Sequence, residues 1–211
     1  INFFIERNGY NLALVDINNN VIKEFTQFDG TYACATFNKD KTSIYLGTRS
    51  RYALIKIDVA TLTVVWDVDI TYDPETINTD FNENIYMYIN SYVYKYDSNG
   101  NEITNENWGD SGTIAEYNIN HIEFDNNNNV YIGNYSNEPK VAKYDSTGNF
   151  QWDFVITSNS SYVSSLVVSE NGYVYFGTKQ NDAKIRKLDA SNGNEITSDN
   201  WPNDGGSTYK D

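Results

Sequence analysis

The sequence is poor in the residues that form disulfides and metal clusters. Its 211 residues include one cysteine, Cys34, one histidine, His121, and three prolines. A single cysteine excludes a disulfide within the chain and a multi-cysteine metal site, and a single histidine excludes a histidine cluster. We interpret Cys34, in the run YACATF, as a small packed residue. His121, in the alternating run INHIEF, is interpreted as a structural residue of a strand, with a general base as the alternative.

Basic residues are scarce as well. Fifteen Lys and Arg stand against 29 Asp and Glu, which gives a net charge of −14 and a sequence pI near 4.3. Such a chain repels phosphate backbones and anionic lipid, so we expect no nucleic-acid partner. No apolar run approaches the roughly 18–20 residues of a membrane-spanning helix, so we expect no membrane span. Aromatic residues make up 15% of the chain, which argues against disorder.

An internal repeat of 41 to 45 residues organises the chain. Four apolar runs, IYLG, IYMY, VYIG and VYFG, begin at residues 44, 85, 130 and 174. A second apolar run ends in an aspartate 12 to 15 residues after each of these starts, at Asp58, Asp97, Asp145 and Asp189. The opening runs INFF and LALVD fit the same frame, so the chain contains about five copies.

Each copy continues in the same way after its aspartate. A turn follows, and glycine in the turns 98–101, 146–149 and 190–194 can supply the positive φ of a tight hairpin. A third run then ends at or shortly before a tryptophan in four copies, at Trp66, Trp108, Trp152 and Trp201. The first copy has Phe25 instead. A fourth alternating run, such as 32–37, 119–124 or 163–168, leads to the next copy.

These runs predict an all-β chain. They are short, rich in β-branched and aromatic residues and separated by turn residues, and no window has a helical stripe. Each copy therefore forms a four-stranded antiparallel sheet, and radial stacking of the copies would cover both faces of each sheet, as in a β-propeller. A β-sandwich is the alternative.

We place the repeats at about residues 1–31, 32–75, 76–117, 118–161 and 162–211 of one β-propeller domain. The first copy lacks its leading strand, and the chain begins at Ile1 without a leader. We therefore expect an incomplete ring that belongs to a larger one, in a processed chain or a segment of a longer polypeptide.

Two runs resemble known propeller repeats. The run VAKYDSTGNFQW at 141–152 resembles the quinoprotein-like (PQQ-like) repeat, and FDNNNNVYIG at 124–133 resembles the SBBP/NHL-type repeat. In the quinoprotein-like family the tryptophan of each repeat docks against a neighbouring blade. The resemblance implies this structural role for the four tryptophans, although Trp108 and Trp201 stand later after their aspartates than Trp66 and Trp152 do. It specifies a blade and says little about activity.

A lysine precedes the aspartate of four copies by two residues, and the two side chains share a strand face. These lysines are Lys56, Lys95, Lys143 and Lys187. A ring of Lys–Asp pairs could bind an anion. The alternative, which we favour, is that each lysine covers a neighbouring blade and each aspartate bonds to the amides of its own turn. We therefore assign structural roles to Asp58, Asp97, Asp145 and Asp189.

Several Asp- and Asn-rich turns, such as 16–20, 97–102 and 125–129, present alternating oxygen donors of the kind that bind calcium. Each offers fewer carboxylates than a tight site gathers, and hairpin turns use the same residues. We also find no phosphate-binding glycine loop or nucleophile motif. The sequence therefore predicts no catalytic residue, no cofactor and no metal.

The function predicted from these features is a non-enzymatic binding or scaffold propeller that contacts protein or carbohydrate. Its aromatic- and Asn-rich loops and polar acidic surface suit such contacts. We expect it outside the cell, on a bacterial surface or a virion of the tail or adhesion type. The alternatives are a quinoprotein-like dehydrogenase, which would use a pyrroloquinoline cofactor and calcium, and a scaffold for envelope assembly.

Overall fold

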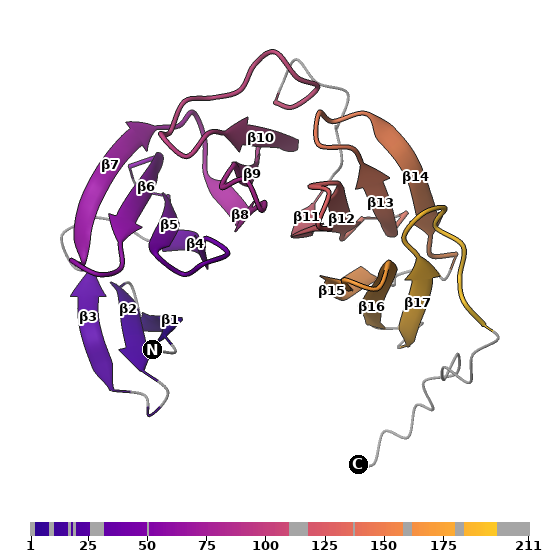
Figure 1. The fold of residues 1–211 in the computed structure, drawn as a ribbon, viewed down its shortest axis with the longest axis horizontal. Coiled ribbons are helices and arrows are strands. Elements are labelled where there is room, and N and C mark those ends of the chain that lie inside the picture. Colours follow the sequence, from indigo (N-terminus) through magenta and orange to yellow (C-terminus); the bar gives the residue numbers. More distant parts are fainter. Residues whose placement is uncertain are drawn as a thin grey trace. The chain divides into compact units, whose positions relative to one another are not determined.

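The computed structural model describes residues 3–8, 11–16, 18, 20–25, 32–49, 51–109, 118–136, 138–157, 162–179 and 184–197. In these residues the regular structure consists of strands β1 to β17 and contains no helix (Figure 1). None of the described segments could therefore cross a membrane as a helix.

The strands form five antiparallel sheets, which we call blades A to E. Blade A contains β1 (Phe3–Asn8), β2 (Asn11–Asp16) and β3 (Val21–Phe25). Blade B contains β4 (Tyr32–Phe37), β5 (Ser43–Thr48), β6 (Ala53–Asp58) and β7 (Thr63–Asp69). Blade C contains β8 (Pro74–Thr79), β9 (Ile85–Ile89) and β10 (Tyr92–Tyr96). Blade D contains β11 (Ile119–Phe124), β12 (Val130–Asn134), β13 (Lys140–Tyr144) and β14 (Phe150–Val155). Blade E contains β15 (Tyr162–Val168), β16 (Tyr173–Lys179) and β17 (Ile185–Asp189).

The chain divides into two compact units. The first comprises residues 1–90 and 94–103, and the second comprises residues 91–93 and 104–211. Blades A and B belong to the first unit and blades D and E to the second, while blade C has residues in both. The assignment of all five repeats to one domain stays a prediction.

The core of the first unit lies between successive blades. Strand β5 is buried along its whole length, because side chains alternate between its two faces and both faces are covered. Leu46 packs in a cluster with Leu14 of blade A, whereas Tyr45 packs in a cluster with Ile77 of blade C. The outer strand β7 is mostly exposed. Burial at inner strands and exposure at the outer one is the pattern of stacked blades.

The second unit is built in the same way. Tyr131 and Val141 of blade D share one buried cluster with Val163 and Phe176 of blade E. Trp152, at the outer strand of blade D, belongs to the same cluster and is 9% exposed. The indole therefore joins the two blades, as expected for a docking residue.

In the described residues blades B and D have the expected four strands, and blade A has three, in agreement with the missing leading strand of the first copy. Blades C and E have three strands where four were expected. In the described part of blades C and E, the fourth run makes a single bridge, Tyr96↔Glu102 in one case and Leu188↔Glu195 in the other. In blade C the Ile103 N–H donates to the Lys95 carbonyl at 2.8 Å beside this bridge, and the next described bond to the third strand is from the Gly109 N–H to the Val93 carbonyl at 2.7 Å. The residues inserted before Trp108 interrupt the ladder. The third sheet also begins at Pro74, two residues before the predicted repeat boundary.

Candidate functional site

Each aspartate that follows a third strand organises the turn behind it. The Asp145 Oδ1 atom accepts hydrogen bonds from the backbone N–H of Thr147 at 2.9 Å and of Asn149 at 3.0 Å. Its Oδ2 atom accepts from Asn149 Nδ2 at 2.9 Å. Asp97 makes the same bonds to Asn99 and Asn101. These carboxylates are thus directed into their own turns, which is the alternative that we favoured over Lys–Asp pairs.

The hydrogen bonds keep the turn aspartates ionised. The Ser191 side chain is the main cause that lowers the pKa of Asp189, and the Thr61 side chain has the same effect on Asp58. For Asp97 and Asp145 partial burial opposes ionisation, but the bonds from Asn101 and Asn149 leave the pKa of both below the ordinary value. All four aspartates thus act as anionic caps of hairpin turns.

The turn after the first strand of a blade uses a similar device. Asp125 Oδ1 accepts from the backbone N–H groups of Asn127 and Asn129 at 2.9 and 3.0 Å, and its Oδ2 accepts from Asn129 Nδ2 at 2.8 Å. Asp80, after β8, binds its turn in the same way. Asp16, which ends β2 and corresponds to Asp97 and Asp145 in the repeat, makes the same set of bonds. The oxygen atoms that suggested calcium from the sequence are thus occupied by N–H donors. Among the described residues, no three His, Cys, Asp or Glu side chains gather into a group that could hold a metal ion.

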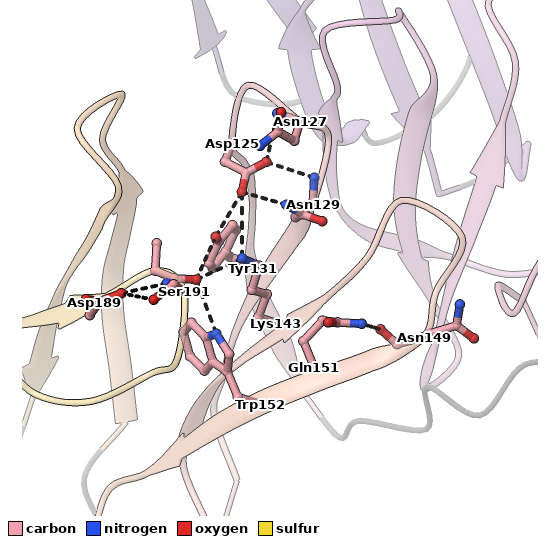
Figure 2. A network of polar contacts seen from close by, with 11 residues as sticks. Asp125, Asn127, Asn129, Tyr131, Lys143, Asn149, Gln151, Trp152, Asp189 and Ser191 are labelled. Atoms are coloured by element: carbon pink, nitrogen blue, oxygen red, sulfur yellow. Dashed lines mark hydrogen bonds and ion pairs between the residues drawn. The ribbon is translucent and has the colours of Figure 1, made fainter.

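Three side chains of blade D converge on one backbone carbonyl of blade E. The Ala190 carbonyl accepts hydrogen bonds from Lys143 Nζ at 2.8 Å, Trp152 Nε1 at 3.2 Å and Tyr131 Oη at 3.4 Å (Figure 2). Lys143 stands opposite both Tyr131 and Trp152 in the strand register. One face of blade D therefore presents a Tyr–Lys–Trp row to the turn of the next blade. We call this row and its carbonyl the latch.

The latch has strong local electrostatics. Lys143 Nζ lies 3.9 Å from Asp125 Oδ2 and 5.1 Å from the centre of the Tyr131 ring. Burial lowers the pKa of Lys143, and the nearby charges of Asp125 and Asp189 counteract this only in part. Burial and the charge of Asp125 raise the pKa of Tyr131. Shifted pKa values often mark active sites. Here Lys143 donates to the Ala190 carbonyl, and the shorter hydrogen bond of the Tyr131 hydroxyl is to Asp125 Oδ2, at 3.0 Å. Both contacts are a structural use of the same chemistry.

A corresponding latch joins blades B and C in the first unit. The Ser98 carbonyl accepts from Lys56 Nζ and from Trp66 Nε1, both at 3.2 Å. Lys56 Nζ also lies 5.5 Å from the centre of the Tyr45 ring, and Tyr45 is opposite Lys56 in the register. The lysines thus cover a neighbouring blade, which is the alternative favoured from the sequence.

The other repeat residues show variants of this arrangement. Trp108 Nε1 donates to the Ser146 carbonyl at 3.2 Å, and its side chain is 1% exposed. Lys95 Nζ lies 5.4 Å from the centre of the Tyr86 ring, and Lys187 Nζ lies 4.0 Å from that of Tyr173. Trp201 lies outside the described residues.

His121 and Cys34 both lie in strands and are at least partly buried. His121 is half-buried in β11, and burial lowers its pKa against the effect of a hydrogen bond with the Ser164 backbone. Burial raises the pKa of the Cys34 thiol to about 12, so the reactive thiolate is rare at neutral pH. These positions agree with the structural roles that we assigned to both residues.

Sequence reasoning missed a pair of aromatic rings in the second unit, one exposed and one half-buried. Tyr135, which directly follows β12, and Tyr162, which begins β15, have ring centres 4.8 Å apart and an interplanar angle of 88°. Tyr135 is 52% exposed. Lys179 stands opposite Tyr162 and places its Nζ 5.7 Å from the ring centre. We call Tyr135 and Tyr162 the tyrosine pair. The sequence signal that could have indicated this pair was an aromatic residue, Tyr135, directly after the apolar run VYIGN.

The chain has no match among protein-family models or curated proteins. Among solved structures it is similar to hydrazine synthase from Kuenenia stuttgartiensis, with 12% identity, a TM-score of 0.65, and coverage of 86% of this chain and 57% of that one. It is also similar to virginiamycin B lyase from Staphylococcus aureus, with 11% identity, a TM-score of 0.60, and coverage of 85% and 62%. A catalytically inactive variant of that lyase with quinupristin gives 12% identity, a TM-score of 0.66, and coverage of 88% and 61%.

The chain thus spans about three-fifths of the length of each of these structures. At such low identity the likeness concerns the fold alone, and it does not distinguish the quinoprotein-like family from the SBBP/NHL type. The neighbours are propeller-type proteins, and the described sheets are antiparallel blades, four-stranded in blades B and D. The chain therefore has a β-propeller fold.

Proposed function

We propose that this chain is a non-enzymatic binding propeller that contacts carbohydrate through the tyrosine pair. The observation that supports this most directly is the exposure of Tyr135 at 52% while its ring rests edge-to-face on Tyr162. Two rings that support each other are already ordered, so binding to them costs little conformational entropy. Their apolar surface can pack on the C–H groups of a sugar, and Lys179 lies beside them as a hydrogen-bond donor.

The location and the partner class belong to the same proposal. We place the protein outside the cell, on a bacterial surface or a virion, where a repeat protein with a net charge of −14 would meet glycans. The resemblance of its repeats to the quinoprotein-like and SBBP/NHL types fits such a scaffold. A protein partner, as in an envelope assembly, is the second candidate, because exposed tyrosines are also common in protein interfaces.

The structural use of the titratable groups supports a non-enzymatic role over a quinoprotein-like dehydrogenase. Two groups with shifted pKa values, Lys143 and Tyr131, are used in contacts within the chain: Lys143 donates to the Ala190 carbonyl, and the Tyr131 hydroxyl donates to Asp125. The names of the similar structures refer to enzymes, but at 11–12% identity their activities do not transfer. Dye-linked dehydrogenase activity in the presence of pyrroloquinoline quinone and calcium would contradict the proposal.

A glycan array tests the proposal directly. We expect the wild-type chain to bind a limited set of glycans and Tyr135→Ala to lose at least about tenfold in affinity. Tyr72→Ala is a matched control, because Tyr72 is 49% exposed and belongs to the first unit. Equal binding by wild type and Tyr135→Ala would overturn the role of the tyrosine pair. A wild-type chain that binds no glycan but captures a defined surface protein would replace carbohydrate by protein as the partner.

A further inference from the structure

A pocket of about 490 Å³ opens in the first unit beside blade A. Leu14 and Ile22 come from blade A, and Val59, Ala60 and Leu62 come from the turn after β6. Lys41, Thr42 and Asp58 complete the lining. The walls are largely apolar, and the volume lies in the range of roughly 300–1,000 Å³ that is typical of ligand sites. The equivalent positions of the other repeats show why the described residues leave this space unfilled.

The pocket adjoins the position that tryptophan fills in the latches. In blades B and D, the residue two before the turn aspartate is a lysine, and tryptophan stands opposite it: Lys56↔Trp66 and Lys143↔Trp152. In blade A the residue two before Asp16 is Leu14, and Lys23 stands opposite. Phe25, which we expected to replace tryptophan here, instead stands opposite Leu12. Its backbone position is thus two residues along the strand from that of tryptophan, and blade A has no indole at this point of the register.

Val59, which lines the pocket, occupies the repeat position of the residues whose carbonyls accept the indole N–H in the latches. Val59 follows Asp58 as Ser98 follows Asp97 and Ala190 follows Asp189, and the carbonyls of Ser98 and Ala190 accept Nε1–H of tryptophan at 3.2 Å. The Val59 N–H donates to Thr42, but no described residue donates to the Val59 carbonyl. Because Val59 lines the pocket, a backbone acceptor without a described donor lies at the wall of the space that an indole would enter.

Leu62 provides an independent sign that no described indole fills this space. It stands where the other turns have Gly100 and Gly193, and like them it has a positive φ, +55°. A Cβ at Gly100 would lie 3.3 Å from the Trp66 ring, and one at Gly193 would lie 2.6 Å from that of Trp152. A side chain is tolerated at position 62 despite the unfavourable φ. Where a tryptophan fills the position, as in the two latches, the facing turn has glycine. Here Lys23 stands in place of the tryptophan and Leu62 in place of the glycine.

We propose that this pocket binds the indole ring of a tryptophan presented by another polypeptide, with the ring N–H directed at the Val59 carbonyl. The same chain shows the complementary chemistry twice, since its own indoles bind equivalent turns in blades C and E. A single ring buries little area, so the isolated contact is weak, with a dissociation constant on the order of 1 mM. It would add to a larger interface rather than form one alone.

Ligand-observed NMR on the wild-type chain tests the chemistry. N-acetyl-L-tryptophanamide should bind with one-to-one stoichiometry. Its 1-methyl analogue, which lacks the ring N–H, should bind several-fold more weakly. Absence of saturable binding up to about 20 mM, or equal affinity for the two compounds, would overturn the proposal. Binding of free indole without binding of the tryptophan derivative would also overturn it, because the site would then serve a small molecule.

Variants locate the binding. Lys23→Trp, alone and combined with Leu62→Gly, should supply the missing indole in cis, raise the melting temperature and abolish probe binding. Lys23→Met is the matched control, because it removes the charge without filling the space and should retain binding. Unchanged probe affinity in a folded Lys23→Trp variant would overturn the assignment to this pocket. If that variant does not fold, the comparison of the two probes on the wild type still decides the question.

Discussion

The indole of Trp152 lies so close to Gly193 that a Cβ at position 193 would stand 2.6 Å from its Cε3 atom. Gly193 also has a φ of +75°, which only glycine adopts without cost. One residue thus meets two constraints: its backbone closes the turn of blade E, and its missing side chain makes room for the tryptophan of blade D. The same relationship, less tight, holds between Trp66 and Gly100.

The first prediction separates these two constraints. Gly172 has a φ of +78°, and a Cβ at this position would meet nothing within 4 Å, so Gly172→Ala reports the backbone cost alone, about 1–2 kcal/mol. Gly193→Ala should cost about 1–3 kcal/mol more, because the indole must move. Chemical denaturation of both variants measures the difference. Equal loss of stability would show that the indole does not press on Gly193 in solution.

Truncation of the tryptophan itself gives the second prediction. Trp152→Ala should destabilise the chain by about 3–5 kcal/mol, because the side chain is 9% exposed and joins two blades. Trp152→Phe should lose less, since a ring remains and only the bond to the Ala190 carbonyl, worth about 1 kcal/mol, disappears. Under conditions where each variant is folded, binding at the tyrosine pair should be retained. Identical unfolding midpoints for wild type and Trp152→Ala would contradict a docking role.

The blade architecture was predictable because strands in stacked sheets leave a strong pattern. Runs such as IYLG became β5, which is buried on both faces, and the following aspartates ended the next strand as expected. The fourth strands of blades C and E were not predictable in the same way. Their pairing depends on how inserted residues are accommodated at an outer edge, where few contacts fix the register. Periodicity therefore located the inner strands of each blade, but it did not show that the fourth run of blades C and E forms only a single bridge.

Acid titration supplies the third prediction. Hydrogen bonds hold the pKa of several turn aspartates, including Asp145, below the ordinary value of 3.8. A carboxyl whose pKa is lower in the folded state stabilises the fold fully above its unfolded pKa, and this stabilisation is lost as the pH falls through the folded pKa. Stability should therefore be level from pH 7 to about 5 and then decrease below about pH 4.

Asp145→Asn is the test of that mechanism at one turn. The variant loses the acceptor that Oδ2 offers to Asn149, so we expect it to be less stable by about 1 kcal/mol at pH 7. Its stability should also fall less steeply in acid than that of the wild type, because one titrating group is absent. A pH dependence identical to that of the wild type would mean that Asp145 does not contribute to acid unfolding.

The site was less predictable than the fold. The sequence placed Lys143 two residues before Asp145 and on the same strand face, which suggested either a pair or a contact with another blade. Its actual partner, the Ala190 carbonyl, is 47 residues away and belongs to the backbone, which the sequence does not reveal. The tyrosine pair was missed for a related reason. Tyr135 and Tyr162 meet through the packing of two blades, and exposure cannot be read from residue type alone.

The last prediction concerns the rate at which the Cys34 thiol is alkylated, which depends on how well the first unit buries it. The residue as a whole is half-buried, yet burial raises the pKa of its thiol to about 12, against the opposing effects of the Gly47 backbone and Arg49. At pH 8 the thiolate fraction is then only about one in 10⁴, compared with roughly a quarter for an ordinary cysteine. Alkylation by iodoacetamide should therefore be slower in the native chain than in urea-unfolded protein by about three orders of magnitude.

Mass spectrometry of the alkylated chain measures this rate, and Cys34→Ser gives the background. Opening of the first unit adds a second route to labelling, so the destabilising Gly47→Ala should accelerate it. A Cβ at position 47 would lie 2.8 Å from the Cys34 Sγ atom and 2.6 Å from Pro74. Gly172→Ala, which lies in the second unit, is the control for an effect confined to the first. Rapid labelling of the native wild type would place the thiol in water and contradict the packing of blades B and C around it.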